Sequence, residues 1–173
     1  MEKAIIETRA GYCGLAWAAA GLVVLNLPSP TPYDAEIELN AALESLGKRA
    51  VLGAADQCKF DLKLLEKDLN SYFEGKTVSL SFPVDWRYYT DFQAKVLQRV
   101  SSIPWGELVS YGQIAAETGN PRGSRAVGGA VGSNRVLLVV PCHRVIAHNG
   151  KIGGFGGGLG WKKRLLGLEG VVI

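Results

Sequence analysis

The sequence predicts an α+β fold, with a small mixed α/β N-terminal domain over residues 1–85 and a mostly helical domain over residues 86–173. Short apolar, strand-like segments fill the beginning of the chain, whereas amphipathic helical spacing dominates its later part. Two short helices with strong end signals also follow one another between residues 110 and 134. These two helices predict a helix-turn-helix in the second domain.

The N-terminal domain is expected to contain four strands and two helices. The clearest helix runs from Phe60 to Phe73, because Leu62, Leu65 and Leu69 recur at helical spacing with charged residues between them. The other helix is expected at 33–46, and the strands at 4–8, 14–19, 22–27 and 77–82, the last of which Pro83 ends.

The second domain follows a polar and aromatic connector at 83–91. We expect an amphipathic helix over 92–100 and a buried strand over 136–140, where β-branched residues and leucines run together. The dipeptide Asn149-Gly150 is a strong turn signal and predicts a hairpin between 144–147 and 151–155. A basic amphipathic helix over 161–168 is the last expected element.

The two helices of the helix-turn-helix have identifiable ends. Ser110 and Gln113 have the spacing of a capping box, in which each side chain accepts from the other residue's backbone N–H. Gly119 is placed to end this first helix. Asn120 and Pro121 then favour the start of the second helix, since Asn is a good N-cap and Pro is tolerated at the first helical position.

The second helix carries an unusual face made of Arg125, Gly128, Gly129 and Gly132. Each internal glycine costs a helix roughly 1 kcal/mol relative to alanine, so the face needs a purpose. Close packing against another protein helix is one interpretation. The other is close approach to DNA, even in the minor groove, with Arg125 inserted between bases. Few long polar side chains are present, so sequence-specific reading of the major groove is not expected.

The charge of the chain is uneven, although its net value is only +3. No Asp or Glu occurs between Glu117 and Glu169. This stretch instead contains eight basic residues: Arg122, Arg125, Arg135, Arg144, Lys151, Lys162, Lys163 and Arg164. A solvated basic face is one interpretation, and a polyanionic partner, most simply nucleic acid, is the one we favour.

Cysteine usage and hydropathy exclude several classes of protein. Cys13, Cys58 and Cys142 are an odd set without metal-ligand spacing, so neither a disulfide framework nor a metal site is expected. No apolar run approaches the ~20 residues of a membrane helix, and the charged N-terminus has no signal-peptide core. We therefore expect a cytoplasmic protein with no membrane partner, no metal and no cofactor.

The stretch VVPCHRVI places Cys142 beside His143 at the end of the expected buried strand. Neighbours in an extended chain point to opposite sides, so a direct contact between thiol and imidazole would need a sharp turn, and a bridging water is the alternative. Glu169 could orient the imidazole, which would complete a Cys–water–His–Glu relay that activates a nucleophile. On these residues alone, a buried structural cysteine is the stronger interpretation. The loop GGFGGGLG at 153–160 would let backbone amides approach a ligand.

Three stretches together resemble one known family. The stretches that carry the resemblance are RAVGGAVGSN, VVPCHRVI and GGFGGGL followed by LEG, with FQAKVLQRVSSIPWGELVSYGQIA upstream. The chain resembles the methylated-DNA–protein-cysteine methyltransferases, also called O6-alkylguanine-DNA alkyltransferases. The resemblance covers about residues 90–170. It implies a ribonuclease H-like N-terminal domain and a winged-helix-like C-terminal domain. It also implies irreversible, single-turnover transfer of an alkyl group from O6-alkylguanine in double-stranded DNA to the protein's own cysteine. O4-alkylthymine would be a further candidate substrate, and the protein would be a monomer.

The resemblance assigns roles to particular residues. Cys142 would be the acceptor, His143 and Glu169 would activate it through water, and Tyr111 would donate to N3 of the flipped base. Arg125 would replace the extruded base, and Asn134 would be the hinge between recognition helix and active site. The base pocket would be formed by Pro141, Val145, Phe155 and Gly156, with the carbonyls of Cys142 and Val145 and the amide of Gly156 facing the guanine. DNA would be contacted by Ser110, Gln113, Arg122, Ser124, Arg125, Gly128, Gly129 and Gly132.

The chain departs from some relatives at Phe155-Gly156, where they have a tyrosine-serine pair, so this loop lacks two hydroxyls. Two other functions remain open. One is a lesion-binding or architectural helix-turn-helix protein without chemistry, for which Cys142 would be dispensable. The other is a Cys-His hydrolase with turnover on acyl substrates, although such an enzyme has no use for Arg125 on a glycine face.

Overall fold

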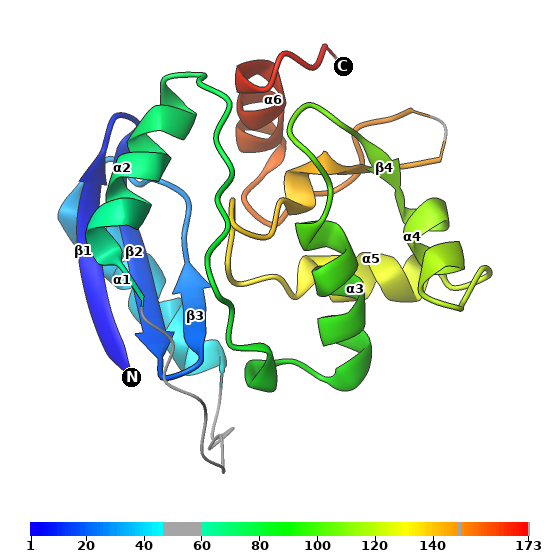
Figure 1. Ribbon diagram of the computed structural model, residues 1–173, viewed down its shortest axis with the longest axis horizontal. Helices are drawn as coiled ribbons and strands as arrows, with labels where there is room; N and C mark the ends of the chain where they lie inside the picture. The colour runs from blue at the N-terminus through cyan, green and yellow to red at the C-terminus, as the bar shows by residue number, and fades with distance from the viewer. Residues whose placement is uncertain (47–59, 149, 173) are drawn as a thin grey trace. The chain divides into compact units, whose positions relative to one another are not determined.

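The computed structural model describes residues 1–46, 60–148 and 150–172. Within these ranges the chain has a mixed α/β fold with six α-helices and two small sheets, coloured by position in the chain in Figure 1. It divides into two compact units, one of Met1–Tyr88 with Arg135–Val139 and one of Tyr89–Asn134 with Val140–Ile173. The sequence analysis places every residue after 85 in the second domain, whereas 135–139 cluster with the first unit.

The first unit contains an antiparallel meander of β1 (Glu2–Thr8), β2 (Gly11–Ala18) and β3 (Gly21–Leu25). Ile5 lies opposite Gly14 in the first pair, and the second pair changes register between Ala16 and Trp17. All five residues of β3 are buried, which explains its unbroken apolar sequence. The three strands expected from the sequence here are confirmed.

Two helices cover this sheet. The helix α1 (Pro32–Ser45) packs on β2, and α2 (Leu62–Phe73) packs on β1. Thr31 and Asp61 cap them by accepting from backbone N–H groups in the first turn, so both helices begin at a side-chain signal. The apolar positions of α2 that predicted the helix face the core, as buried Leu65 and Leu69 show.

The expected strand at 77–82 is not formed. The residues of this stretch alternate between exposed and half-buried, which fits the pattern that suggested a strand, but Phe82 N donates to Leu80 O in a tight turn. It contributes no rung to either sheet in the described part of the chain. Alternating apolar and polar side chains indicate that one face of the segment is buried, but a strand also needs a neighbouring backbone at hydrogen-bonding distance. After it come the one-turn helix η1 (Trp86–Tyr88) and the second unit.

The second unit is built from four helices around a short parallel pair of strands. In chain order these are α3 (Asp91–Ser101), β4 (Val109–Ser110), α4 (Tyr111–Glu117), α5 (Ser124–Gly132), the one-turn helix η2 (Cys142–Arg144), β5 (Val145–Ile146) and α6 (Leu159–Leu168). The helices α3 and α4 both pack on α5. Val109 pairs with Val145 and Ser110 with Ile146, so the start of α4 lies beside the residues that follow η2.

The capping box at Ser110 and Gln113 is confirmed, with the Gln113 side chain accepting from Ser110 N at 2.8 Å and Ser110 Oγ accepting from Gln113 N at 3.2 Å. The second helix of the pair starts later than the sequence predicts. It begins at Ser124 with Gly123 as N-cap, whereas Asn120 and Pro121 lie in the preceding turn. Asn120 N instead donates back to Ala115 O, which closes the end of α4.

The expected buried strand over 136–140 is replaced by two tight turns. Val136 forms a bridge with Leu25 of β3, and Leu137 and Val140 are also single bridge residues rather than parts of a strand. Val139 N then donates to Leu137 O across Leu138, which has φ +70°, and Cys142 N donates to Val140 O across Pro141, with φ −79° and ψ 62°. These are a γ-turn and an inverse γ-turn. The apolar sequence of 136–140 predicts its burial correctly, but it does not predict the backbone conformation.

The expected hairpin around residue 149 is reduced to a turn. Gly150 N donates to Ala147 O and Ala147 N to Lys151 O, and no further ladder joins the arms in the described residues. Asn149 itself lies outside the described residues. Among the described residues, no helix has both the length and the hydropathy needed to cross a membrane.

Candidate active site

The turn η2 separates the side chains of three consecutive functional residues. Pro141 ends the preceding segment with the inverse γ-turn, and the chain then winds through Cys142, His143 and Arg144. A 3₁₀ turn contains three residues, so successive side chains point about a third of a turn apart. All three side chains are buried and each reaches a different set of partners.

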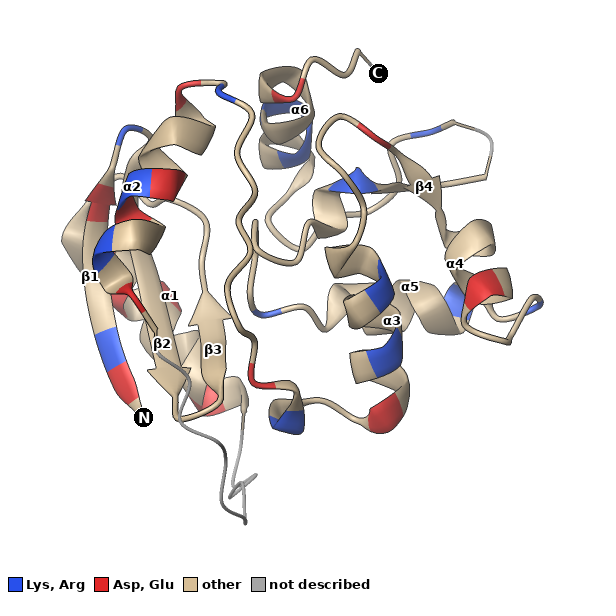
Figure 2. Cartoon of the chain, in the orientation of Figure 1, with Lys and Arg blue, Asp and Glu red and all other residues tan. Residues whose placement is uncertain are grey.

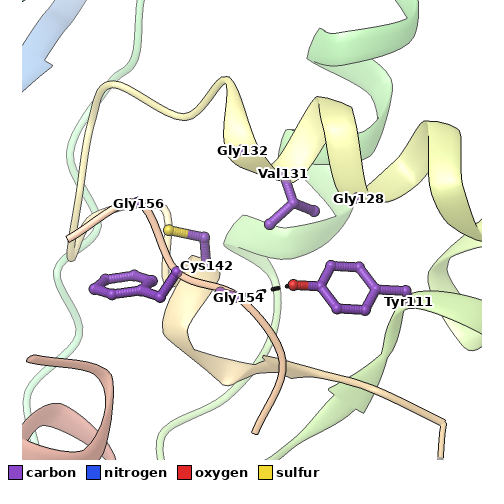
Figure 3. A pocket seen from close by; sticks show the side chains of 8 residues that line it. Tyr111, Gly128, Val131, Gly132, Cys142, Gly154 and Gly156 are labelled. Carbon is purple, nitrogen blue, oxygen red and sulfur yellow. Dashed lines mark hydrogen bonds between the residues drawn. The ribbon is translucent and has the colours of Figure 1, made fainter. Parts of the chain in front are cut away.

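Cys142 lies at a cavity of about 200 Å³. Eight residues line it: Tyr111, Gly128, Val131, Gly132, Cys142, Gly154, Phe155 and Gly156. Figure 3 shows Gly128 and Gly132 on the helix side and Gly154 and Gly156 on the loop side, with the sulfur of Cys142 near Gly156. A Cβ added at any of these four glycines would meet no protein atom within 4 Å. The walls are therefore largely backbone, which lets a flat ligand come close to main-chain groups.

Tyr111 supplies the polar side chain of the cavity opposite the thiol. It is the first residue of α4, and its hydroxyl donates to Gly154 O at 3.4 Å (Figure 3). Burial raises the pKa of the Tyr111 phenol, and the nearby Cys142 raises it further. The phenol thus stays protonated and can act as a hydrogen-bond donor in the cavity.

The thiol of Cys142 is protonated at neutral pH in this structure. Burial raises its pKa to about 11, against the lowering effects of a hydrogen bond from Asn134 and of the positive charge of Lys162. The Asn134 amide donates to Sγ at 3.0 Å and to Val140 O at 2.9 Å. Asn134 therefore ties the segment after α5 to the sulfur and supplies a donor that would stabilise a thiolate.

His143, Arg144 and Glu169 form a buried polar group. His143 Nε2 lies 2.7 Å from Glu169 Oε1, and Arg144 approaches both carboxylate oxygens. Burial alone would raise the pKa of Glu169, but the hydrogen bonds and charges of His143 and Arg144 outweigh it and lower the pKa to about 2. Burial lowers the pKa of His143, although Glu169 opposes this effect. At neutral pH the carboxylate is therefore charged and the imidazole neutral, with its Nε2–H directed at Glu169.

Lys162 is a fully buried lysine beside the cavity. Its ammonium donates to Val145 O at 2.6 Å and to Gly154 O at 3.3 Å. Burial lowers its pKa to about 8, so it remains mostly charged at neutral pH. It connects α6 to η2 and to the cavity loop. Lys162 and Arg144 are two of the eight basic residues for which a solvated face and a polyanionic partner were the interpretations, yet both are buried.

A sequence signal existed for Lys162. It precedes Leu165 and Leu166 by three and four positions, so it shares the apolar face of α6. Val131, Gly154 and Gly106 were also not assigned to the site, because their roles depend on contacts between distant segments.

The α4–α5 pair presents the glycine face to solvent. Arg122, Ser124, Arg125, Gly129 and Gly132 are exposed. Figure 2 shows basic positions around the start of α5 and along α6. Val127 and Val131 on the other side of α5 are buried. The glycine face is thus not used for packing between the described protein helices.

The residues expected at the site fall into two groups. The first is assembled around the cavity: Cys142, Tyr111, Phe155, Gly156, Gly128 and Gly132 line it, Asn134 contacts the thiol, and His143 contacts Glu169. The second lies outside the lining: Pro141, Val145, Ser110, Gln113, Arg122, Ser124, Arg125 and Gly129. The Val145 carbonyl is buried and already accepts from Lys162. In the described residues, no group of three or more His, Cys, Asp or Glu side chains could hold a metal ion.

Comparison with known proteins gives the family. Residues 91–171 match the family described as 6-O-methylguanine DNA methyltransferase, DNA binding domain. The structure is similar to that of Mycobacterium tuberculosis OGT in complex with DNA, with 32% identity, a TM-score of 0.67, and coverage of 95% of this chain and 90% of that one. The chain belongs to the methylated-DNA–protein-cysteine methyltransferase family.

Other members of the family align with this chain over different shares of their length. A Pyrococcus kodakaraensis O6-methylguanine-DNA methyltransferase has the same fold at 26% identity, with a TM-score of 0.76 and coverage of 98% of this chain and all of that one. The methylated-DNA–protein-cysteine methyltransferase of Saccharolobus islandicus is 48% identical over 105 residues, which are 61% of this chain and 67% of that protein. The Mycobacterium tuberculosis protein of the same name is 48% identical over 101 residues, which are 58% of this chain and only 61% of that relative.

Proposed function

We propose that this protein repairs DNA by moving the alkyl group of O6-alkylguanine onto Cys142, once per molecule. The observation that carries the proposal is a cysteine at a glycine-walled cavity, with a phenol donor across it and a basic, glycine-faced helix beside it. Chemistry on a base requires taking it out of the stack, and a damaged base is easier to extract. Family membership supports the same activity.

The roles follow from the contacts. The thiol proton passes through a water to Nδ1 of His143, whose Nε2–H is held by Glu169. The sulfur bonds to the alkyl carbon as the carbon–O6 bond breaks, and the guanine takes a proton from the Tyr111 hydroxyl. The proton held by His143 restores the phenol through water. The product is a thioether and intact guanine, so atoms and charges balance and the protein is not regenerated.

The base would be held mainly by backbone. The carbonyls of Cys142 and Val145 would accept from the exocyclic amine, and the Gly156 N–H would face O6. A carbonyl has two lone pairs, so Val145 O can serve the base while it accepts from Lys162. Phe155 and Pro141 would complete the walls. The same pocket would admit O4-alkylthymine, a smaller base.

DNA would lie along α4 and α5. Arg125 would fill the gap left by the flipped base, and Asn134 would couple the recognition helix to the acceptor. The exposed glycines Gly129 and Gly132 and the half-buried Gly128 would allow close approach to the minor groove, where Ser110, Gln113, Arg122 and Ser124 would contact the backbone. Residues 86–173 would thus form the DNA-binding and acceptor domain, with a winged-helix-like core, and residues 1–85 a ribonuclease H-like supporting domain. We propose that the protein acts as a monomer.

The test is mass analysis after mixing excess protein with duplex DNA containing one O6-methylguanine. We expect one methyl group on the tryptic peptide 136–144 and restored guanine in the DNA. The matched controls are Cys142→Ser and the same duplex with unmodified guanine, neither of which should give a product. An unmodified peptide with the lesion intact would refute the proposal. Turnover on acyl substrates would instead favour the hydrolase alternative.

A further inference from the structure

We propose that Arg144 and the backbone N–H of Gly106 are positioning groups that fix the Glu169 carboxylate and keep His143 available as a proton acceptor. This inference deepens the proposed function, because it concerns the base of the same site. Neither group touches the cavity. Both would act on Cys142 only through the carboxylate and the imidazole.

The first argument is that the carboxylate is fully occupied. Oε1 accepts from His143 Nε2 at 2.7 Å and from Arg144 Nη2 at 2.9 Å. Oε2 accepts from Arg144 Nε at 2.9 Å and from Gly106 N at 3.1 Å. A carboxylate offers about four lone-pair sites, so these four donors leave it one orientation. Three of the four come from Arg144 and Gly106, which therefore set the direction of the bond to His143.

The second argument is that each of these groups is itself held. Arg144 Nη1 donates to the carbonyl of Ile103, which fixes the guanidinium in the plane of the carboxylate. Gly106 has φ +75°, in the left-handed region, and a Cβ there would lie 3.2 Å from the backbone oxygen of Glu169. Glycine is therefore required to bring this N–H to Oε2. The turn is closed by Glu107 N, which donates to Pro104 O at 3.2 Å.

The third argument concerns charge. Glu169 and Lys162 face the imidazole from α6, Arg144 and Cys142 belong to its own turn, and the loop before β4 contributes the uncharged Gly106 N–H. His143 Nε2 and Arg144 Nη2 bond the same oxygen, so they lie within the ~6 Å over which a charge shifts a pKa.

A carboxylate paired with the imidazole alone would favour the imidazolium, which cannot accept the thiol proton. Burial opposes this effect most strongly and lowers the pKa of His143, and the permanent cation of Arg144 lowers it further. The imidazole is thereby kept neutral, in the form that can accept a proton.

The test compares Arg144→Met, which removes the charge, with Arg144→Lys, which keeps it but cannot bond both oxygens in the same plane. Histidine titration is followed by NMR on ¹⁵N-labelled protein, with His148→Gln to assign the two histidines. Single-turnover methyl transfer is measured from pH 5 to 9. We expect Arg144→Met to raise the pKa of His143 by about one unit or more. The acid limb of the pH–rate profile should move to higher pH by the same amount.

Arg144→Lys should leave that pKa near the wild-type value and lower the rate about equally at every pH. If Arg144→Met does not fold, Arg144→Lys still tests the proposal. A raised pKa of His143 in Arg144→Lys would overturn the charge argument. Arg164→Met is the matched control, since this exposed arginine of α6 stacks on Trp161 and should change neither readout. An unshifted His143 in Arg144→Met would overturn the proposal. The titration needs no DNA, so it remains decisive even if no alkyl transfer is found.

Discussion

Replacing Asn134 with alanine removes the amide that donates to the sulfur of Cys142 at 3.0 Å. A hydrogen bond to a charged group contributes about 1.5–3 kcal/mol, and this one stabilises the thiolate more than the thiol. At about 1.36 kcal/mol per pKa unit, the pKa of Cys142 should rise by about one to two units. If transfer proceeds through the thiolate, the single-turnover rate constant should fall about tenfold to a hundredfold. Asn134→Asp should cost more, because a carboxylate beside the sulfur repels the thiolate.

The assay is the rate of methyl transfer from an O6-methylguanine duplex under single-turnover conditions, together with the pH dependence of Cys142 alkylation by iodoacetamide, located by peptide mass. Ser133→Ala is the matched control. Ser133 caps the same helix end and donates to Ala130 O at 2.7 Å, and this bond does not involve the sulfur. Equal losses in Asn134→Ala and Ser133→Ala would show a general effect on the helix end. An unchanged iodoacetamide profile in Asn134→Ala would refute the hydrogen-bond argument.

Four further predictions concern other parts of the site. Lys162→Met should lower alkyl transfer from both duplex DNA and free alkylguanine, because the carbonyls of Val145 and of the cavity residue Gly154 lose their donor; a loss confined to duplex DNA would contradict this. Arg125→Ala should weaken transfer from duplex DNA far more than from free O6-alkylguanine, and equal losses would remove its proposed role. Gly129→Ala should stabilise the helix by up to about 1 kcal/mol in urea unfolding while weakening DNA binding, since its Cβ meets no protein atom; unchanged binding would speak against a DNA-facing glycine helix. Glu169 has a folded pKa of about 2 against an ordinary 4.5, so its stabilisation is complete above pH 4.5 and lost as pH falls toward 2. Urea unfolding should show a loss of about 3 kcal/mol over that range that is absent in Glu169→Gln.

Much of the fold could be predicted from local signals. The spacing of Leu62, Leu65 and Leu69 and the capping box of Ser110 and Gln113 depend on residues within one or two turns, and the structure confirms both helices. The N-cap expected at Asn120 is wrong. The segments at 77–82 and 136–140 could not be predicted correctly. Their apolar patterns report burial, whereas pairing depends on which backbone lies alongside, and this information is not in the segment itself.

The site shows the same division. Cys142 and His143 adjoin in sequence and were found as a motif, and Glu169 could be proposed because no other acid lies near in the acid-free stretch. Lys162 was misread, since a lysine among basic neighbours suggests a solvated face. Its burial depends on two carbonyls, 8 and 17 residues away, that satisfy the ammonium. The role of Gly106 could not be predicted from its neighbours, because the carboxylate that its N–H reaches lies 63 residues further along the chain.

The return of residues 135–139 to the first unit has a consequence for any attempt to dissect the protein. The chain leaves α5, forms backbone bonds to Leu25 from both sides, and only then reaches Cys142. A fragment starting at residue 89 would keep α5 and Cys142 but expose Val136 and Leu138, which are buried in the intact chain. The fragment would therefore be prone to self-association. The segment between α5 and Cys142 would also lose its backbone hydrogen bonds to Leu25. Residues 135–139 cluster with the N-terminal half, so a fragment that keeps Cys142 in its native chain path must keep that half as well.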